Sequence, residues 1–390
     1  MPDIAILGGC GHVGLPLGLA FARAGKTVAA IDSDPQRVAQ TAAGRMPFAD
    51  RGADDLLKRT LAAGTFRPTP DPAAARDADA LITVVGTPID EHLNPSFDSM
   101  RDLVLAHRPH FRPGQLLVVR STVLPGTTAR LAALVPDLDV AFCPERVAQG
   151  FALEEIASLP QIVGGVTPRA QARAEALFRL IAPDVVPMQP LAAELTKLFT
   201  NSWRYVQFAV ANQFWTMANE YGIDFYEIFD AMTRNYPRAK DLPRAGFTAG
   251  PCLFKDTMML SAFHNNAFFL GHAAMLVNEG LPNYLVQRAA RRFKLGEMTA
   301  AILGMTFKAD SDDPRDSLAI KLRRILEGAC RRVVCTDPFL REPWVSPLEE
   351  ALRADILFIG APHSAYRGLD FGGKPVVDVW AMTPQRLKTL

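Results

Sequence analysis

One of the five cysteines stands where its thiol could act as a nucleophile. Cys252 follows a Gly- and Pro-rich loop that begins at Gly246, and a helical pattern begins directly after it. Free N–H groups at a helix start, and the ammonium of a nearby residue such as Lys255, stabilise the thiolate, which is the reactive form of cysteine. Packing alone would also account for a cysteine in this position. The segments described next favour the chemical role, attack on a carbonyl carbon.

A glycine-rich turn near the N-terminus predicts a dinucleotide site. The strand-like run 4–7 leads into Gly9-Cys10-Gly11-His12-Val13-Gly14, and a helical pattern follows. Glycines at this spacing let the backbone approach a pyrophosphate, whose charge the helix N-terminus stabilises. Asp32 ends the next strand-like run, where a carboxylate accepts a hydrogen bond from a ribose 2′-hydroxyl and repels a 2′-phosphate. The pattern predicts NAD as the cofactor, although Arg37 is near enough to meet a 2′-phosphate instead.

A long helical stretch, residues 192–221, carries three polar residues on one face. Glu194, Lys197 and Asn201 lie at positions i, i+3 and i+7. A solvated charged face would also give this spacing. Because the neighbouring residues make the helix apolar nearly all round, we expect Lys197 to face a cleft or a partner.

Polar residues also follow several strand-like runs, where a parallel sheet places its ligand crevice. Thr122 follows one run and Pro144-Glu145-Arg146 follows the next. Lys308 and Arg315 lie in a mixed-charge loop after a later run. We expect these two cations to meet an anionic ligand.

The pattern of strands and helices around these residues predicts an α/β fold. Strand-like runs alternate with helical patterns in the first half, at residues 4–7, 28–31, 80–85, 116–119, 140–142 and 162–163, and they return at 300–303, 333–335, 356–359 and 376–377. Helical patterns fill residues 192–221 and about 253–293 between the two sets. The sequence predicts two Rossmann-like doubly wound parallel-sheet domains joined by a long central helix and a helical middle domain. We place the boundaries at 1–190, 191–296 and 297–390.

Composition narrows the class of partner. Lys and Arg number 42 against 41 Asp and Glu, a net charge of +1, which is too small to drive nucleic-acid binding. A small-molecule substrate is expected. The longest apolar stretch, residues 258–277, is interrupted by His264, Asn265, Asn266 and His272, so it reads as a buried helix that does not span a membrane. An odd number of cysteines without Cys-x-x-Cys spacing predicts neither a disulfide framework nor a zinc ribbon, and no metal site is expected. These features and the lack of a signal pattern predict a cytoplasmic protein.

Taken in order, these segments resemble the UDP-glucose/GDP-mannose dehydrogenase family over essentially the whole chain. The resemblance rests on GCGHVG with Asp32, Gly86-Thr87-Pro88, STVLPGTT, CPER with Gly150, AELTKLFTN, GPCLFKD and GMTFKADSDDPRDS. It implies two successive NAD-dependent oxidations of a sugar C6 alcohol to a carboxylate. Cys252 would hold the carbon as a thiohemiacetal and then as a thioester.

The resemblance also implies roles for individual residues. Lys197 and Asn201 would stabilise the oxyanion, and Asp256 would position Lys197 and a water. Glu145 would be the base for thioester hydrolysis, with Thr122 ordering the water. The implied cofactor contacts are the glycine turn, Asp32, Arg37, Thr87, Thr122 and Arg315. The implied substrate contacts are Glu145, Arg146, Lys197, Asn201, Phe247 and Lys308, with Arg238 reaching the neighbouring subunit's substrate in a homodimer.

Three segments depart from the family pattern. Pro251 and Phe254 stand where many members have Ser or Gly and Pro around the nucleophile, and Gln149 replaces an acidic residue often seen before Gly150. Asp378-Val379-Trp380 stands where many members have a Gly-Arg-Asn type turn, so an arginine expected at the substrate is missing. These changes bear on which sugar and nucleobase are bound.

The leading hypothesis is therefore an NAD-dependent 6-dehydrogenase of a nucleoside-diphosphate hexose in polysaccharide or glycoside biosynthesis, with UDP- or dTDP-glucose as the first candidate substrate. A UDP-N-acetylhexosamine or GDP-mannose is the nearest alternative. A 3-hydroxyacid dehydrogenase, which removes a single hydride and needs no cysteine, is a second reaction type. A nucleotide-sugar or NAD sensor without turnover is the non-enzymatic alternative.

Overall fold

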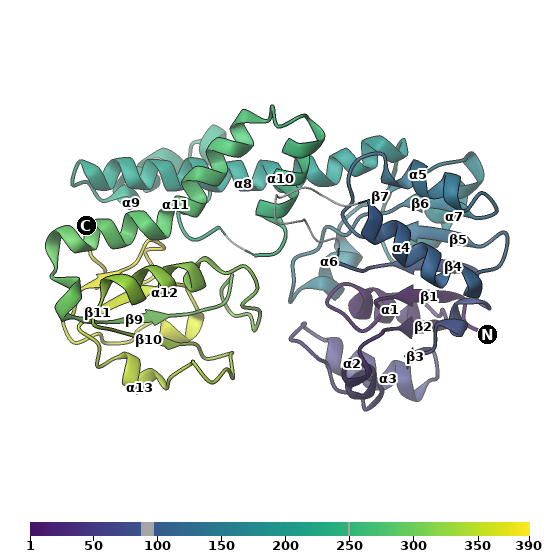
Figure 1. Ribbon diagram of the computed structural model, residues 1–390, viewed down its shortest axis with the longest axis horizontal. Coiled ribbons are helices and arrows are strands. Elements are labelled where there is room, and N and C mark those ends of the chain that lie inside the picture. Colours follow the sequence, from purple (N-terminus) through teal and green to yellow (C-terminus); the bar gives the residue numbers. More distant parts are fainter. Residues whose placement is uncertain (87–96, 249) are drawn as a thin grey trace. The chain divides into compact units, whose positions relative to one another are not determined.

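The computed structural model describes residues 1–86, 97–248 and 250–390. The chain divides into two compact units, residues 1–199 and residues 200–390, with the boundary inside the long helix α8 (Pro190–Glu220). Each unit is a sheet with helices packed against it (Figure 1). The α/β prediction with two doubly wound sheets and a long central helix is confirmed.

The first unit is built on an eight-stranded sheet in the order β3-β2-β1-β4-β5-β6-β7-β8. Neighbouring strands are parallel, except that β6 and β7 are antiparallel. The order reverses between β1 and β4, and parallel sheets form their ligand crevice beyond the carboxyl ends of strands at such a point. The strands are β1 (Ile4–Leu7), β2 (Val28–Ile31), β3 (Phe66–Thr69), β4 (Ala80–Thr83), β5 (Leu116–Val119), β6 (Asp139–Phe142), β7 (Gln161–Gly165) and β8 (Val185–Pro187).

Helices cover both faces of this sheet because each central strand is apolar on both sides. In β1, Ile4 and Ile6 pack into the core on the face of α1, whereas Ala5 and Leu7 pack into the core on the face of α4 and α5. The helices are α1 (Gly14–Arg23), α2 (Pro35–Ala42), α3 (Ala53–Ala62), α4 (Asp98–His107), α5 (Thr127–Leu134), α6 (Ala152–Ser158) and α7 (Pro168–Phe178), with the short 3-10 helices Pro72–Ala75 and Arg108–His110.

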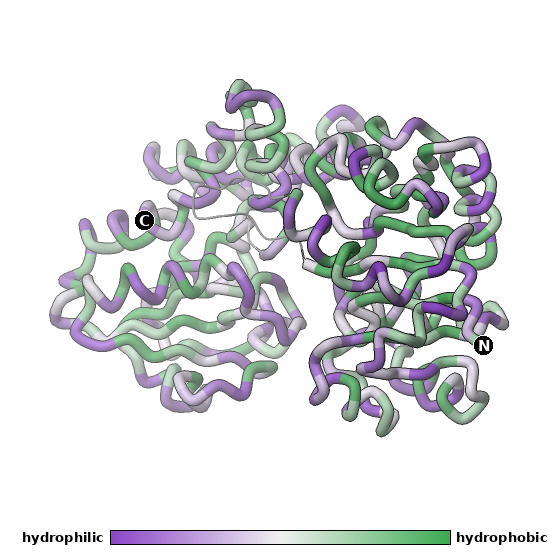
Figure 2. The backbone as a smooth tube through the Cα atoms, turned by 45° about the vertical axis from the view of Figure 1, so that its right-hand side comes forward, coloured by the Kyte–Doolittle hydropathy of each residue, from purple (hydrophilic) through white to green (hydrophobic). Residues whose placement is uncertain are grey.

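The second unit combines a four-stranded parallel sheet with the helical middle region. The strand order is β10-β9-β11-β12, made of β9 (Thr299–Leu303), β10 (Arg332–Thr336), β11 (Ile356–Ile359) and β12 (Val376–Val377). Figure 2 shows these strands as a largely hydrophobic layer. The helices are the second part of α8, α9 (Phe225–Thr233), α10 (Leu253–Phe263), α11 (Phe269–Arg292), α12 (Leu318–Ala329) and α13 (Leu348–Ala351), with 3-10 turns at Pro237–Ala239, Leu295–Glu297 and Ser364–Tyr366.

The structure differs from the predicted elements in two ways. Strands β3 and β8 were missed because each contains a proline, Pro68 or Pro187, which an edge strand tolerates but which argues against a central one. The single buried helix predicted over 258–277 is wrong, and Phe269, Leu270 and Leu276 within it are 77%, 68% and 69% exposed. It breaks between α10 and α11, where Asn265 and Asn266 adopt left-handed φ values of 52° and 58°.

Among the described residues, no helix is both long and apolar enough to cross a membrane. The cytoplasmic location stays a prediction.

Candidate active site

The glycine turn has the backbone geometry that a pyrophosphate requires. A Cβ on Gly9 would lie 2.6 Å from Ala30 Cα, and a Cβ on Gly14 would lie 2.3 Å from the Gly8 carbonyl oxygen, so both positions need glycine. A Cβ on Gly11 would meet nothing closer than 3.5 Å, which leaves this side of the turn open to a ligand. Since α1 begins at Gly14, its first N–H groups lie at the turn. These residues fit a dinucleotide.

Asp32 occupies the position expected of a ribose-binding carboxylate. It directly follows β2 and is 8% exposed, and its Oδ2 accepts the Cys10 N–H at 3.0 Å. Its Oδ1 accepts the Asp34 N–H at 3.1 Å. Arg37 is exposed and lies 3.3 Å from the Asp34 carboxylate, so its charge already has an acidic partner beside it. Contact of Arg37 with a cofactor stays a prediction.

His12, inside the glycine turn, connects it to the segment after β6. Its ring packs on Phe48 at 4.1 Å between centroids, and its Nδ1 lies 3.1 Å from the Gln149 Nε2. Gln149 is the position where an acid was expected. In this chain its side chain contacts the glycine turn.

Glu145 is held by four donors. Arg120, which directly follows β5, places Nη2 at 2.6 Å and Nε at 3.0 Å from Glu145 Oε2. The N–H groups of Arg146 and Val147 donate to Oε1 at 2.8 and 3.1 Å. The Arg120 guanidinium also donates to the Cys143 carbonyl oxygen at 3.0 Å and to Gln161 Oε1 at 2.9 Å. The sequence analysis missed Arg120. The feature that could have marked it is its position, a charged residue directly after a strand made only of apolar residues.

The other predicted residues after these strands take less defined positions. Thr122 is half-buried and is the third residue after β5. The Arg146 side chain donates to the Pro160 carbonyl, and burial lowers the pKa of its guanidinium. Contacts of Thr122 and Arg146 with ligands stay predictions.

Glu194, one turn before Lys197 on α8, has a structural role. Its carboxylate is 1% exposed and accepts the Gly126 N–H at 2.5 Å, the Thr128 N–H at 2.8 Å and the Thr128 hydroxyl at 2.6 Å. It therefore caps the start of α5. Burial raises the pKa of the Glu194 carboxyl, and the three hydrogen bonds only partly offset this rise.

Cys252 is the N-cap of α10, and its side chain is exposed. Asp256 lies one turn farther on and is fully buried, and its N–H donates to the Cys252 carbonyl at 2.8 Å. Asp256 Oδ2 accepts the Asn201 side-chain N–H at 2.6 Å. Its Oδ1 makes no hydrogen bond to any described residue, and the Lys255 ammonium lies 3.6 Å away. The second unit thus brings together Cys252, Asp256 and Asn201.

Lys197 is half-buried and belongs to the first unit, one turn before Asn201 on α8. The prediction that Asp256 positions Lys197 stays a prediction.

Two contacts fix the loop that leads to Cys252. The side chain of Asn212 on α8 accepts the Gly246 N–H at 2.8 Å and donates to the Gly246 carbonyl at 3.0 Å. At Gly250, φ is +99°, its N–H donates to the Asp316 carbonyl at 3.2 Å, and a Cβ would lie 2.6 Å from the Phe307 ring. The cysteine loop therefore packs on the 304–317 loop. Asn212 was also missed, because nothing in its local sequence marks it.

Arg315 is a cation that interacts electrostatically with Cys252. The side chain forms a bidentate pair with Asp313, with Nη2 2.5 Å from Oδ2 and Nε 2.9 Å from Oδ1. This pairing is the main cause that raises the pKa of the guanidinium, and the charge of a Cys252 thiolate raises it further. The attraction is mutual, so Arg315 favours the thiolate.

The remaining predicted residues are spread over the described chain. Lys308 is half-buried in the 304–317 loop. Phe247 is only 5% exposed and packs edge-on against Trp380, which belongs to the Asp378-Val379-Trp380 segment where an arginine was expected. Arg238 is exposed and its Nε donates to the Tyr236 hydroxyl at 2.8 Å. Thr87 lies outside the described residues. Ligand contacts of these four residues stay predictions.

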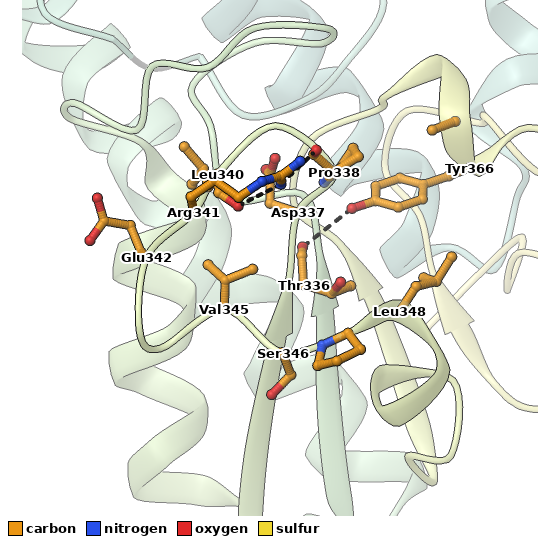
Figure 3. A pocket seen from close by; sticks show the side chains of 12 residues that line it. Thr336, Asp337, Pro338, Leu340, Arg341, Glu342, Val345, Ser346, Leu348 and Tyr366 are labelled. Atoms are coloured by element: carbon orange, nitrogen blue, oxygen red, sulfur yellow. Dashed lines mark hydrogen bonds between the residues drawn. The ribbon is translucent and has the colours of Figure 1, made fainter.

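A cavity of about 440 Å³ lies at the carboxyl end of β10 (Figure 3). Its walls include Asp337, Arg341 and Tyr366, and the Tyr366 hydroxyl donates to the Thr336 carbonyl at 3.2 Å. None of the predicted catalytic residues lines it. The described residues include no group of three or more His, Cys, Asp or Glu side chains that could hold a metal ion.

Comparisons with known proteins agree with this geometry. Residues 3–182 match the NAD binding domain of the UDP-glucose/GDP-mannose dehydrogenase family, residues 191–279 its central domain and residues 301–385 its UDP binding domain. A UDP-N-acetyl-D-mannosamine dehydrogenase of Pyrococcus horikoshii is 29% identical, over 94% of this chain and 91% of that protein. An NDP-N-acetyl-D-galactosaminuronic acid dehydrogenase of Ralstonia solanacearum is also 29% identical, over 93% and 91%.

Among solved structures, a UDP-glucose dehydrogenase from Pyrobaculum islandicum superposes with a TM-score of 0.90 at 27% identity, covering 98% of this chain and 95% of that one. The fold, the NAD-binding turn and the three matched domains lead to one conclusion. The chain belongs to the UDP-glucose/GDP-mannose dehydrogenase family of nucleotide-sugar dehydrogenases, and its cofactor is NAD.

Proposed function

We propose that this protein oxidises the C6 alcohol of a nucleoside-diphosphate hexose to a carboxylate. The observation that carries the proposal is the exposed Cys252 thiol at the N-cap of α10, with buried Asp256 one turn on and bonded to Asn201. An enzyme that stopped after one hydride would not need such a nucleophile. When bound, NAD supplies the hydride acceptor for each of the two oxidations.

The side chains supply the remaining chemistry. The Cys252 thiolate adds to the C6 aldehyde carbon, and the carbonyl electron pair moves to oxygen, where Asn201 and Lys197 stabilise it. Loss of hydride from that carbon leaves a thioester. Water then attacks the thioester carbonyl, and the C–S bond breaks with its electron pair returning to sulfur. One alcohol, one water and two NAD give one carboxylate, two NADH and three protons.

Glu145 and Thr122 are the residues proposed to prepare the water. Glu145 is anchored by Arg120, so its carboxylate has a fixed direction. Lys308 and Arg146 would bind the nucleotide sugar, and Arg315 would lie on the cofactor side. In this proposal residues 1–190 bind NAD. Residues 191–296 include α8 and α10, the two helices that carry the proposed catalytic residues, and residues 297–390 bind the nucleotide of the sugar substrate.

The sugar is proposed to be an N-acetylated hexose carried by UDP. The names of the relatives favour this class, since they act on N-acetylmannosamine or on an N-acetylgalactosamine derivative. UDP-glucose, which the sequence suggested as the first candidate substrate, becomes the second candidate. It should still be assayed, because the chain is similar to a UDP-glucose dehydrogenase structure. GDP-mannose and dTDP-glucose are the other two nucleotide sugars in the panel of substrates to be assayed.

A homodimer is proposed from the exposed apolar face of α8. Trp203 is 62% exposed, Val210 40%, Phe214 39% and Met217 49%, and their spacing places them on one side of the helix. A second copy of the chain would cover this face and would bring Arg238 toward the partner's substrate. Trp203→Asp should therefore yield a monomer in sedimentation velocity. Leu105→Asp, at an exposed apolar position on α4, should leave the dimer intact.

Counting NADH against sugar tests the function. With the correct nucleotide sugar we expect two NADH per sugar and a carboxylate product, whereas a ratio of one would contradict the proposal. Cys252→Ala should make no acid at any sugar concentration while NAD binding, measured by calorimetry, stays within about twofold of the parent. Ligand binding without any NADH across the whole panel would favour a sensor.

A further inference from the structure

The second unit repeats the arrangement of strand, glycine and carboxylate found at Asp32 in the first. Strands β10-β9-β11-β12 correspond in order to β2-β1-β4-β5, and Gly304 follows β9 with a left-handed φ of 90° as Gly8 follows β1 with 85°. Asp337 follows β10 as Asp32 follows β2. Asp337 Oδ2 accepts the Met305 N–H at 2.7 Å, as Asp32 Oδ2 accepts the Cys10 N–H at 3.0 Å.

The two arrangements differ in the group that lies against the carboxylate, Asp32 in the first unit and Asp337 in the second. Asp32 is 8% exposed and Asp337 is 4% exposed, and the side chain of Asp337, which is fully buried, lies against the imidazole of His363. His363 Nε2 lies 3.0 Å from Asp337 Oδ2, and the ring packs between Phe339 and Tyr366 at centroid distances of 5.0 and 5.5 Å. Figure 3 shows Asp337 and Tyr366 on the cavity wall. The His363 side chain thus lies where a ribose hydroxyl would lie at Asp32 if that carboxylate binds the cofactor as proposed.

The hydrogen bonds of His363 define its tautomer. Its Nδ1 accepts the Asp310 N–H at 2.9 Å, so Nδ1 carries no proton and Nε2 carries it. The Nε2–H lies between Asp337 Oδ2 and the Thr306 hydroxyl oxygen, which is 3.2 Å away. The Thr306 hydroxyl in turn donates to the Lys308 carbonyl at 2.8 Å. The imidazole therefore contacts the chain on both sides of Lys308, through the Thr306 hydroxyl before it and the Asp310 backbone N–H after it.

A second pair of bonds completes this clamp. Asp310 adopts a left-handed φ of 51°, which is unfavourable for a residue with a side chain. Its carboxylate accepts the N–H of Ser364 at 2.8 Å and the Ser364 hydroxyl at 2.9 Å. Residues 363–364 thus hold residues 306–310 by their side chains and backbone together.

We propose that His363 is a positioning residue that holds the Lys308 segment in the conformation that binds the nucleotide sugar. The inference rests on the proposed function, in which Lys308 contacts the sugar nucleotide. It predicts that loosening this clamp raises the KM for the nucleotide sugar more than the KM for NAD, since the glycine turn lies in the other unit and Arg315, the cofactor contact proposed in this loop, is held separately by Asp313.

Two variants separate the two bonds of the ring. In His363→Gln the amide nitrogen can replace Nε2 toward Asp337, but the bond from the Asp310 N–H is lost. In His363→Asn the amide oxygen can replace Nδ1 toward Asp310, but the bond to Asp337 is lost. The Gln variant should raise the sugar KM about fivefold, the ratio that corresponds to one neutral hydrogen bond. The Asn variant should keep the sugar KM near the parent value and lower the melting temperature more.

Hydrogen exchange at the Asp310 amide gives a reading that does not depend on activity. We expect it to exchange faster in His363→Gln than in the parent and His363→Asn proteins. His107→Gln is the matched control, because the His107 Nδ1 bonds to the Leu103 carbonyl at 2.9 Å within α4, in the first unit. It should change none of these quantities.

The outcomes separate the two proposals. A parent protein that produces no NADH from any nucleotide sugar would end the proposed function, while the exchange result would still decide the clamp. An active parent protein whose His363→Gln variant shows the parent sugar KM and parent exchange at Asp310 would overturn the inference about His363.

Discussion

Arg120 and Glu145 form an ion pair at the ends of two adjacent strands, β5 and β6, with the Arg120 Nη2 2.6 Å from the Glu145 Oε2. The Arg120 side chain is 2% exposed and the Glu145 side chain 13%. Such a pair costs desolvation energy, and the protein offsets part of this cost with the bonds from Arg120 to the Cys143 carbonyl and to Gln161. The arrangement fixes one carboxylate where the sheet places its ligand crevice.

Glu145→Gln should stop turnover at the thioester. Gln has the shape of Glu but cannot take a proton from water, so hydrolysis should slow by about 10²- to 10⁴-fold. Rapid mixing should then show a burst of two NADH per active site followed by a slow phase. Mass spectrometry should find the sugar acid attached to Cys252. A variant with the parent steady-state rate and no adduct would remove Glu145 from the hydrolysis step.

Arg120→Met should destabilise the first unit. Breaking a buried pair leaves an uncompensated charge, which costs about 3 to 5 kcal/mol of unfolding free energy. Urea unfolding measures this loss. The double variant Arg120→Met, Glu145→Gln should recover part of the lost unfolding free energy, because it no longer carries the unpaired charge of Glu145. If Arg120→Met lost less than about 1 kcal/mol of unfolding free energy, the ion pair would contribute no more to stability than a solvent-exposed pair does, which would contradict the prediction.

The conformation at Gly250 gives a prediction about the cysteine loop. Gly250→Ala would place a Cβ 2.6 Å from the Phe307 ring at a φ of +99°, so the loop that leads to Cys252 must shift. We expect kcat to fall by at least about tenfold, since small displacements of a reacting group are costly. Gly328→Ala on α12 is the control, since a Cβ there meets nothing within 4 Å. It should keep full activity.

The sequence predicts the central elements well because their signals are local. Strands such as β1 and β4 are buried on both faces and read as apolar runs, and the glycine turn and Cys252 before α10 are recognisable by spacing alone. The contacts that hold the site are different. Arg120 and Glu145 are 25 residues apart, Asn212 and Gly246 are 34 apart, and His363 and Asp310 are 53 apart. Such pairs depend on strand order and on how loops approach one another, and no short pattern encodes either.

Glu194 predicts a pH dependence of stability. Burial raises the pKa of its carboxyl in the folded protein above the ordinary value of 4.5. The folded state therefore binds the proton more tightly than the unfolded state, so this contribution is present at low pH and is lost as pH rises from about 4.5 through the raised pKa. Glu194→Gln removes the titration. The unfolding free energy of the parent, relative to the variant, should decrease between pH 4 and pH 7 in urea titrations, and a constant difference would show that the pKa is not raised.

Asp32 should set the choice between NAD and NADP. Its carboxylate ends β2 beside the glycine turn, where it would accept a ribose hydroxyl and repel a 2′-phosphate. Asp32→Ala should therefore raise the KM for NAD by about tenfold or more, the cost of a hydrogen bond to a charged group, and reduce the preference over NADP. Asp71→Ala is a suitable control because Asp71 also follows a strand of the same sheet, β3, and accepts a backbone N–H, from Ala73 at 2.9 Å. The ratio of kcat/KM for the two cofactors checks both variants. An unchanged ratio in Asp32→Ala would mean that the ribose lies elsewhere.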